Sequence, residues 1–348
     1  MGAERMFFRP ILQGAIRASG FLSLARRMDA RPDTFRVLVY HRIAEPDGPA
    51  CGDPTLISAS PEMFRVQVRY LARHYNPVSG DRVLQALRGE AALPPRAVLV
   101  TFDDGYRDFA THAWPILKEY GVPAVMFVPT AFPSVGRAFW WDVLHDVVAG
   151  ATVPHATLPM LGPTALGTEH ERQATVRRLN RRLRLRPPEE VAQLIRETIQ
   201  ALGVPVPEHD LLLCWNDLRA LASEGLMVAA HTRHHPPVPS LRPEDVADEI
   251  RQARADLQRE LGAAPPMFAY PFGMADPDAL PILEAEGIVA AFTMAPGANT
   301  LGETNPLLLC RRAVNGAKTL TDLALSLISP YARLQHWRWQ RAHGSGLT

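Results

Sequence analysis

The sequence predicts an α/β fold built on a parallel β-sheet or barrel. Short apolar segments typical of buried strands alternate with helical segments along most of the 348 residues. The polar clusters come directly after these strands, and the carboxyl ends of the strands are where α/β barrels build their active sites. Hydrophobic residues make up 47% of the chain, which is ample for a packed core. The length allows one large barrel or two ordinary domains.

The individual elements follow from hydrophobic patterning. Strands are expected at 35–40, 97–102, 124–128, 227–230, 267–270 and 290–294, where short apolar runs occur. Helical spacing predicts helices over 61–74, 108–120, 215–224, 242–261 and 277–286. Gly121, Gly225 and Gly287 follow three of these helices, which is a common way for a helix to end.

The pattern changes between about residues 150 and 210, where two further helices are expected at 169–185 and 189–202. We interpret this stretch as a helical insertion on the barrel. The first helix is rich in arginine, and a solvated helix face is favoured over a phosphate or polyanion site. The arginines are Arg172, Arg177, Arg178, Arg181, Arg182 and Arg184.

The two ends of the chain differ from this pattern. Residues 1–34 form a basic, weakly amphipathic segment, in which Arg5, Arg9 and Arg17 interrupt every apolar run. It therefore predicts neither a signal peptide nor a transmembrane helix. A terminal helix packed on its own domain is favoured, and peripheral contact with an anionic membrane surface is the alternative. Residues 326–348 form a basic aromatic tail that suits a membrane interface, a sugar surface or a packed helix. A cytoplasmic location, peripheral to the inner membrane in the alternative, is expected.

Charge and cysteine content exclude other classes. The formal net charge is +1, from 37 basic and 36 acidic residues, so no cationic field indicates nucleic acid as the main partner. Cys51, Cys214 and Cys310 lie far apart, which excludes a disulfide framework and a cysteine-based zinc site.

Two polar clusters indicate chemistry. Asp103 and Asp104 follow the strand at 97–102, and adjacent carboxylates at a strand end point in different directions. One is then available for a metal and the other for a substrate, although a helix N-cap would also explain the pair. His231 and His235 follow the strand at 227–230, four residues apart, and His234 between them is expected either to point outward or to support the other two histidines. Two imidazoles and one carboxylate are a common ligand set for Zn²⁺ or a similar ion.

Three motifs in this order resemble the polysaccharide deacetylase (NodB-homology) family, carbohydrate esterase family 4. They are TFDDGY at 101–106, HTRHHP at 231–236 and FAYPFG at 268–273, and the resemblance extends from about residue 35 to 314. The early VLVYHRI and the FAYPFG motif are similar to the branch that acts on exopolysaccharides or their precursors. The resemblance implies a distorted, incomplete (β/α)7 barrel, here with a helical insertion, as the catalytic domain over 35–325.

The resemblance also implies roles for the motif residues. Asp104, His231 and His235 would bind a divalent metal, with Zn²⁺ expected. Asp103 would be the general base, and the backbone N–H of Tyr106 would stabilise the oxyanion.

The sequence departs from the family pattern at two places. Ala269 stands where many relatives have an arginine that orients the base, and Arg311 or Arg312 is a candidate to replace it. The C-terminal Leu–His motif that commonly supplies the general acid is absent, and His41 is the candidate substitute. Aromatic residues around the cleft are candidates for sugar binding, with one of Trp140 and Trp141 expected at the cleft. The predicted substrate-binding residues are Tyr270, Pro271, Phe272 and Trp215.

The function that these residues imply is a metal-dependent hydrolase acting on carbon–nitrogen bonds other than peptide bonds. It would remove N-acetyl groups from N-acetylated sugars of a polysaccharide or of a lipid-linked precursor. Two alternatives remain open. One is hydrolysis of another non-peptide C–N bond by the same metal and base. The other is a catalytically silent glycan-binding protein, which Ala269 and the missing late histidine motivate.

Overall fold

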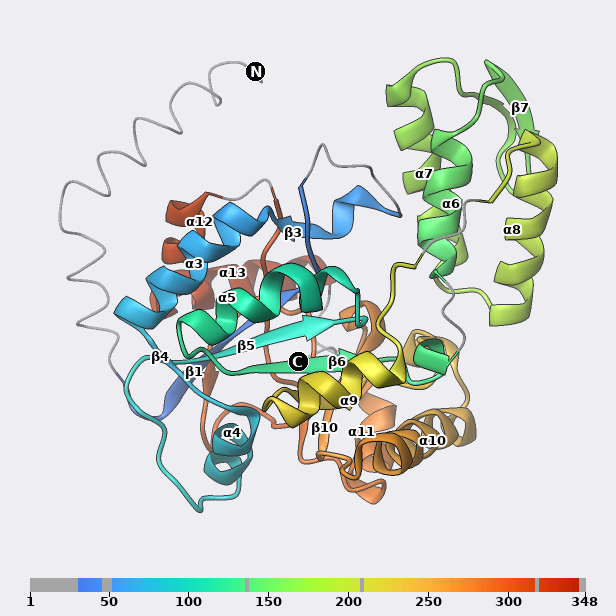
Figure 1. Ribbon diagram of the computed structural model, residues 1–348. Helices are drawn as coiled ribbons and strands as arrows, with labels where there is room; N and C mark the ends of the chain where they lie inside the picture. The colour runs from blue at the N-terminus through green and yellow to red at the C-terminus, as the bar shows by residue number, and fades with distance from the viewer. Residues whose placement is uncertain (1–30, 46–51, 135–137, 207–209, 317–318, 344–348) are drawn as a thin grey trace.

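A curled, mainly parallel β-sheet forms the centre of the molecule (Figure 1). The structure is a computed structural model that describes residues 31–45, 52–134, 138–206, 210–316 and 319–343. Most of the predicted N-terminal segment lies outside these residues. The strand order is β11-β10-β9-β6-β5-β1-β12, with β4 beside β5 and β13 beside β1. The strands are β1 (Thr34–Tyr40), β4 (Asn76–Pro77), β5 (Ala97–Asp103), β6 (Ala124–Val128), β9 (Met227–Ala230), β10 (Met267–Ala269), β11 (Ala290–Phe292), β12 (Asn299–Thr300) and β13 (Arg312–Ala313).

The central strands are buried along their whole length, which explains their continuous apolar sequences. Every residue of β1 and β5 is buried, and the two strands pair in parallel from Phe35 with Ala97 to Tyr40 with Phe102. Among the described strands of this sheet, β12 alone runs antiparallel, pairing with the start of β1. Parallel sheets of this kind are covered on both faces and therefore lack the apolar–polar alternation of half-exposed strands.

An extended segment, residues 309–314, links the two edges of the sheet. Leu309 donates its backbone N–H to Ala291 of β11 at 2.9 Å, and Val314 donates to Val39 of β1 at 3.0 Å. The sheet thus curls into a distorted, incomplete barrel, and Arg311 lies in the segment that crosses its open side.

Helices cover the outside of the barrel. The first of them, α3, begins after Ser60, whose side chain accepts the N–H of Met63, and it buries Phe64, Val68 and Leu71. The helices around the barrel are α3 (Pro61–His74), α4 (Gly80–Leu87), α5 (Trp114–Glu119), α9 (Trp215–Ser223), α10 (Pro243–Leu261), α11 (Leu280–Ala285) and α12 (Leu320–Ser326). Short 3-10 turns lie at Pro54–Leu56, Phe132–Ser134, Val238–Ser240, Pro271–Gly273 and Pro277–Ala279, and a small separate sheet pairs β2 (Arg42–Ile43) with β3 (Ile57–Ala59).

Two predicted helices are shorter than their sequence patterns indicate. The helix expected over 108–120 begins with a π-helical turn, Phe109–Ala113, before α5. Pro115 has no N–H to donate to the carbonyl of Thr111, and a wider turn accommodates this gap. The helix expected over 277–286 begins with the 3-10 turn at Pro277–Ala279, and only α11 is α-helical.

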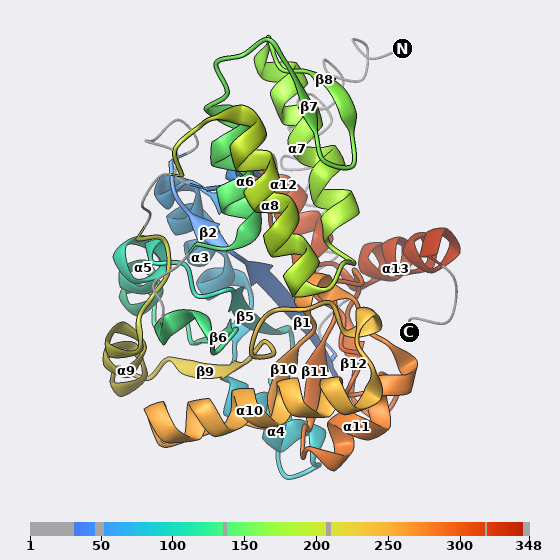
Figure 2. The same cartoon turned by 90° about the vertical axis from the view of Figure 1, so that its right-hand side faces the viewer.

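The insertion has its own hydrophobic core and stands beside the barrel (Figure 1). It consists of α6 (Trp140–Ala149), the hairpin of β7 (His155–Leu158) and β8 (Gly162–Ala165), α7 (Glu169–Leu183) and α8 (Pro188–Leu202). Leu144, Leu179 and Ile195 meet in its core. Figure 2 shows α7 and α8 beyond the carboxyl ends of the strands. The division of the chain into an N-terminal segment (1–34), a catalytic domain (35–325) and a C-terminal tail (326–348) stays a prediction from the sequence.

The C-terminal helix α13 (Ser329–His343) projects from the barrel (Figure 2). The start of α13 is hydrogen-bonded to the sheet through Arg36 of β1. This buried arginine donates to the Leu327 carbonyl at 2.9 Å and to Ser329 Oγ at 2.6 Å. Tyr331, Leu334 and Trp337 are exposed on α13. Within the described ranges, none of the helices has the length and apolar character needed to cross a membrane.

Candidate active site

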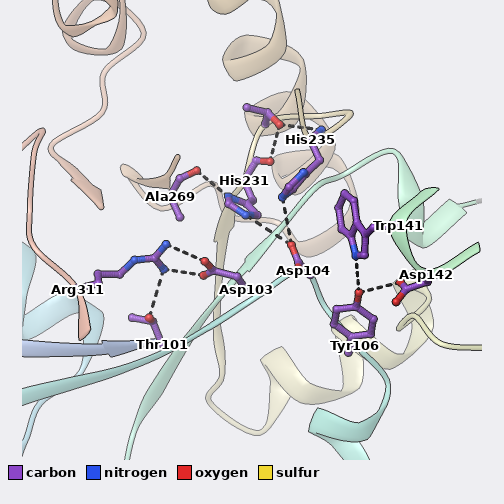
Figure 3. Close-up of polar contacts among 11 residues, drawn as sticks. Thr101, Asp103, Asp104, Tyr106, Trp141, Asp142, His231, His235, Ala269 and Arg311 are labelled. Atoms are coloured by element: carbon purple, nitrogen blue, oxygen red, sulfur yellow. Dashed lines mark hydrogen bonds and ion pairs between the residues drawn. The ribbon is translucent and has the colours of Figure 1, made fainter. Parts of the chain in front are cut away.

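The two adjacent carboxylates leave the end of β5 in different directions (Figure 3). Asp103 is the last strand residue, and Asp104 adopts a left-handed backbone with φ 75°, followed by Gly105 with φ 77°. The Asp104 N–H donates to the carbonyl of Phe127 on β6 at 2.9 Å, which stabilises this turn. Aspartate tolerates left-handed backbone better than most residues. The turn therefore separates two carboxylates that the sequence places side by side.

The histidine loop that follows β9 is also sharply bent. Thr232 and His235 both have positive φ, and the His235 N–H donates to Thr232 Oγ1 at 2.9 Å. His231 Nδ1 lies 2.7 Å from the carbonyl oxygen of Ala269 on β10. Because a carbonyl only accepts, Nδ1 carries the proton and Nε2 keeps its lone pair. Strained backbone of this kind is common at functional sites.

Asp104, His231 and His235 form a buried cluster that fits a divalent metal ion. One ligand atom from each residue lies within 4.8 Å of the other two. Asp104 Oδ1 is 3.6 Å from His231 Nε2 and 3.3 Å from His235 Nε2, yet it is buried without a hydrogen-bond partner among the described residues. A carboxylate oxygen facing two imidazole nitrogens is the donor set that Zn²⁺ and similar ions bind.

The electrostatics of the cluster favour the ligating protonation states. Burial alone would raise the pKa of Asp104, but the nearby His235 ring, with Nε2 3.3 Å from Oδ1, outweighs it and lowers the pKa to about 2. Burial lowers the pKa of His231 to about 4, so this imidazole is neutral at physiological pH. A metal ion needs an ionised carboxylate and neutral imidazoles as ligands. It would therefore have no proton to displace from the Asp104 carboxylate or from His231 Nε2.

His234 lies outside this cluster although it stands between two of the proposed ligands. Its side chain is half exposed, and Nδ1 lies 2.7 Å from Glu249 Oε1. Glu249 also accepts the backbone N–H groups of Arg233 and His234. Of the two expectations for His234, the outward direction is the one that the structure shows.

Asp103 is held by a buried arginine from the linking segment. Both oxygens of Asp103 accept hydrogen bonds of 2.7 Å from the guanidinium of Arg311, which is fully buried and also donates to the Thr293 carbonyl at 2.9 Å. Burial would raise the pKa of Asp103, but the charge of Arg311 outweighs it and leaves the pKa below its ordinary value. Of the two arginines that the sequence offered, Arg311 is therefore the one that contacts Asp103. Arg312 instead contacts Gln335 of α13.

Tyr106 belongs to a second buried network beside the metal cluster (Figure 3). Its hydroxyl donates to Asp142 Oδ2 at 2.8 Å and accepts from Trp141 Nε1 at 3.0 Å. Burial raises the pKa of Asp142 to about 7. The backbone N–H of Tyr106 has no acceptor among the described residues. Its side chain is therefore engaged in packing the insertion, while its N–H remains available to a ligand.

Asp103 and the cluster of Asp104, His231 and His235 face a single cavity of about 480 Å³ at the carboxyl ends of the strands, whereas Tyr106 is not among the residues that line it. The predicted residues Asp103, Asp104, His231, His235, His41 and Phe272 all line it, as do both Trp140 and Trp141. Phe272 packs edge-on against His235, with ring centroids 4.7 Å apart. Sequence reasoning missed several other lining residues, which are Asp53, Leu56, Arg177, Asn180, Arg181, Arg184, Gly273 and Met294.

The arginines of α7 differ from the expectation of a purely solvated face. Arg177, Arg181 and Arg184 are exposed, but they also line the cavity. The reason is tertiary, because the insertion places this side of α7 next to the strand ends. The spacing of these arginines in the sequence indicates that they share one side of the helix. It does not indicate which part of the protein that side faces.

Three of the predicted substrate-binding residues are not brought to the cavity. Tyr270 is fully buried, and its hydroxyl donates to the Leu307 carbonyl at 2.9 Å. Trp215 packs in the barrel core and donates Nε1 to Ser134 Oγ at 2.8 Å. Pro271 is buried as well. Of the aromatic strand end, only Phe272 turns toward the cavity, because its positive φ of 56° reverses the chain there.

Comparison with known proteins adds independent findings. Residues 90–184 and 185–291, more than half of the chain, match the sequence profile of the family described as polysaccharide deacetylase. A segment of 92 residues is 35% identical to the poly-beta-1,6-N-acetyl-D-glucosamine N-deacetylase of Escherichia coli K12, and it covers 26% of this chain but only 13% of that protein.

Two solved structures share the fold. One is the Streptococcus pyogenes deacetylase PplD in complex with acetate, with a TM-score of 0.58 and 19% identity over 85% of this chain and 99% of that chain. The other is IcaB from Ammonifex degensii, with a TM-score of 0.56 and 22% identity over 85% of this chain and 98% of that chain.

Proposed function

Because the chain belongs to the polysaccharide deacetylase family, as its motifs predicted, we propose that it is a metal-dependent deacetylase. It removes N-acetyl groups from N-acetylated sugar units of a polysaccharide or its precursor. The observation that supports this most is the pairing of a metal-type cluster with a second carboxylate, Asp103, in one cavity. A protein that only bound glycans would not need a base beside a metal site.

Asp104, His231 and His235 would hold the ion, with Zn²⁺ as the expected species. When bound, a divalent ion polarises the amide carbonyl and lowers the pKa of water. Asp103 accepts the proton of the attacking water, and its lowered pKa keeps it ionised for this role. Arg311 fixes the orientation of Asp103 through both carboxylate oxygens, and each oxygen still has a lone pair for the incoming proton.

The other steps of amide hydrolysis fall to neighbouring groups. The backbone N–H of Tyr106 donates to the oxygen that becomes negatively charged as water adds to the carbonyl carbon. When the C–N bond breaks, the leaving nitrogen needs a proton, because an amide anion is a very poor leaving group near neutral pH. His41 lines the same cavity and is the proposed donor. Trp140, Trp141 and Phe272 offer apolar surfaces against which a sugar ring can pack.

Acetate release from metal-loaded protein tests the proposal. Wild-type protein is expected to release acetate, and free amine in equal amount, from N-acetylglucosamine oligosaccharides. Asp103→Asn is expected to lose about 10²–10⁴-fold in kcat, the usual contribution of a general base, while keeping its metal. Asp248→Asn is the matched control, because Asp248 is an exposed aspartate paired with Arg251.

The two alternatives predict different results in the same assay. A hydrolase of another C–N bond would leave the oligosaccharides intact and act on small cyclic or N-acyl amides. A silent glycan-binding protein would bind the oligosaccharides and release no acetate, and Asp103→Asn would then change nothing that the assay detects.

We also propose peripheral contact with an anionic membrane surface, through the exposed face of α13. Tyr331, Leu334 and Trp337 are exposed there, and Arg341 lies over the Trp337 ring at 4.7 Å. Aromatic and cationic side chains on one helix suit a membrane interface. Sedimentation with anionic vesicles, but not with neutral ones, supports the contact, and equal behaviour with both contradicts it.

A further inference from the structure

One side of α7 presents three arginines to the catalytic cavity. Arg177 and Arg181 of α7 and Arg184, the helical cap residue after it, occupy positions i, i+4 and i+7 and therefore share one side of the helix. The opposite side, with Val176, Leu179 and Leu183, packs into the core of the insertion. All three arginines line the same cavity as Asp103 and the proposed metal ligands Asp104, His231 and His235. We call these three residues the arginine face.

The arginine face has no internal counter-charge. In the described part of the chain, no carboxylate lies within ion-pair distance of these three guanidinium groups, and Arg184 only stacks over the Phe272 ring at 5.7 Å. Other arginines of the insertion are engaged. Arg172 pairs with Glu169, Arg186 pairs with Glu190, and Arg182 donates to the Met160 carbonyl. Like charges at these spacings repel one another, so an external anion would relieve an unfavourable arrangement.

The acidic residues of the cavity do not fill this role. Asp103 is already neutralised by Arg311, and Asp104 faces the two imidazoles. Asp53, the third acidic residue of the lining, accepts two hydrogen bonds from Thr55. The positive charge of the arginine face is therefore available to a ligand, and a bound divalent ion would make the cavity more positive still. Asn180, which lies on the same side of α7, also lines the cavity, and its buried Oδ1 accepts no hydrogen bond from the described residues.

We propose that the arginine face binds an anionic group that the substrate carries next to its acetylated sugar. This inference rests on the proposed function and names its substrate class: an N-acetylated sugar bearing a phosphate or a carboxylate. Guanidinium groups bind both oxyanions through paired N–H donors. An uncharged N-acetylated sugar would leave three cations facing the cavity without a counter-ion. A lipid-linked sugar phosphate, a soluble sugar phosphate and an acidic polysaccharide share the required chemistry.

The first experiment compares substrates that differ in charge. Acetate release is measured on a neutral N-acetylglucosamine tetrasaccharide, on N-acetylglucosamine 1-phosphate, on the same phosphate esterified to a short isoprenoid alcohol, and on a hyaluronan tetrasaccharide. At least one anionic substrate is expected to exceed the neutral one in kcat/KM by about tenfold or more. The best of the anionic substrates identifies the source of the charge. Equal kcat/KM on the neutral and all anionic substrates would overturn the inference.

A double variant tests the residues. Arg177→Gln/Arg181→Gln is expected to lose about 100-fold in kcat/KM on the preferred anionic substrate, about tenfold for each charge-assisted contact. Turnover of the neutral substrate should fall far less, and the loss on the anionic substrate should shrink at high salt because exposed charges are screened. Arg178→Gln is the matched control, since Arg178 is exposed on the same helix and does not line the cavity. An equal loss on neutral and anionic substrates would mean a structural role and contradict the proposal.

A binding measurement separates this inference from the proposed function. Inorganic pyrophosphate is titrated calorimetrically into chelator-treated protein, so that no metal contributes to anion binding. Wild type and Arg178→Gln are expected to bind it, and the double variant is expected to bind about 100-fold more weakly. Pyrophosphate binding without acetate release from any substrate would support the arginine face and refute the deacetylase. Acetate release with equal pyrophosphate affinity in all three proteins would do the reverse.

Discussion

Replacing Arg311 with methionine would test how the protein keeps Asp103 ionised. Arg311 is fully buried and donates two 2.7 Å hydrogen bonds to Asp103, so its loss leaves a buried carboxylate without its counter-charge. Methionine has a similar reach but neither charge nor donors. Removing one partner of a buried ion pair costs about 3–5 kcal/mol in the free energy of unfolding. We expect Arg311→Met to lose stability in this range at pH 8.

The loss should depend on pH with a definite sign. In the wild type the pKa of Asp103 lies below its ordinary value of 3.8, so the ion pair stabilises the fold above that pH and the stabilisation is lost as pH falls below it. In Arg311→Met, burial is left to raise the pKa of Asp103, and the folded variant takes up a proton as pH falls. The difference in stability between the two proteins should therefore shrink from pH 8 to pH 5.

Urea unfolding of chelator-treated protein, followed by circular dichroism at both pH values, measures this difference. Arg311→Met/Asp103→Asn should be more stable than Arg311→Met alone, because it buries no unpaired charge. Arg312→Met is the control, since Arg312 contacts Gln335 and not Asp103. In metal-loaded protein, the acid limb of kcat/KM should move to higher pH in Arg311→Met. An equal loss of stability at pH 5 and pH 8, together with an unmoved acid limb, would refute the reasoning.

Three other substitutions have distinct expected results. His235→Ala removes one of three proposed ligands and should lose most of the bound metal by elemental analysis, whereas His234→Ala, at an exposed position, should keep it; equal metal content in both would contradict the site. Tyr106→Phe should cost about 1–3 kcal/mol in urea unfolding through its lost phenol hydrogen bond, yet keep acetate release within a few-fold because the backbone N–H remains. A 100-fold loss of activity would show that the hydroxyl itself takes part. Gly273 has a left-handed φ of +68°, and the Cβ added in Gly273→Ala would clash with the Met294 side chain. Thermal unfolding should therefore show a larger loss of stability in Gly273→Ala than in Gly262→Ala. Gly262 also has positive φ but nothing within 4 Å, so only the left-handed backbone cost of about 1–2 kcal/mol applies there.

Most of the fold could be predicted from local patterns. The bounds expected for α3 and β6 agree with the structure. Both follow from local features of the sequence, which are the apolar pattern of each segment and, for α3, the capping residue Ser60 that precedes it. The closeness of the aspartate pair and the two histidines followed from the same information, whereas the choice of Asp104 over Asp103 as the ligand came from the family resemblance. Asp104 and His231 come directly after β5 and β9, and parallel strands bring their carboxyl ends to one side of a sheet.

The sequence limited the arginine that would orient Asp103 to two candidates, Arg311 and Arg312. Arg311 and Arg312 are adjacent in an extended segment, where successive side chains point to opposite sides. Which one faces the barrel interior depends on how residues 309–314 register against β11 and β1. That register is set by contacts between distant parts of the chain, so the local sequence does not specify it.

The sequence by itself determined the long buried strands of the sheet and several of the helices between them, because hydrophobic periodicity and backbone preferences act over a few residues. The short strands β12 and β13 and the hairpin of β7 and β8 were not predicted. Only the tertiary structure decided which side chains share the cavity. It buried Tyr270 and Trp215 in the core and turned Phe272 toward the proposed metal site. It also placed Arg177 and Arg181 beside that site, because the insertion packs as a unit whose position depends on long-range contacts rather than on its own sequence pattern.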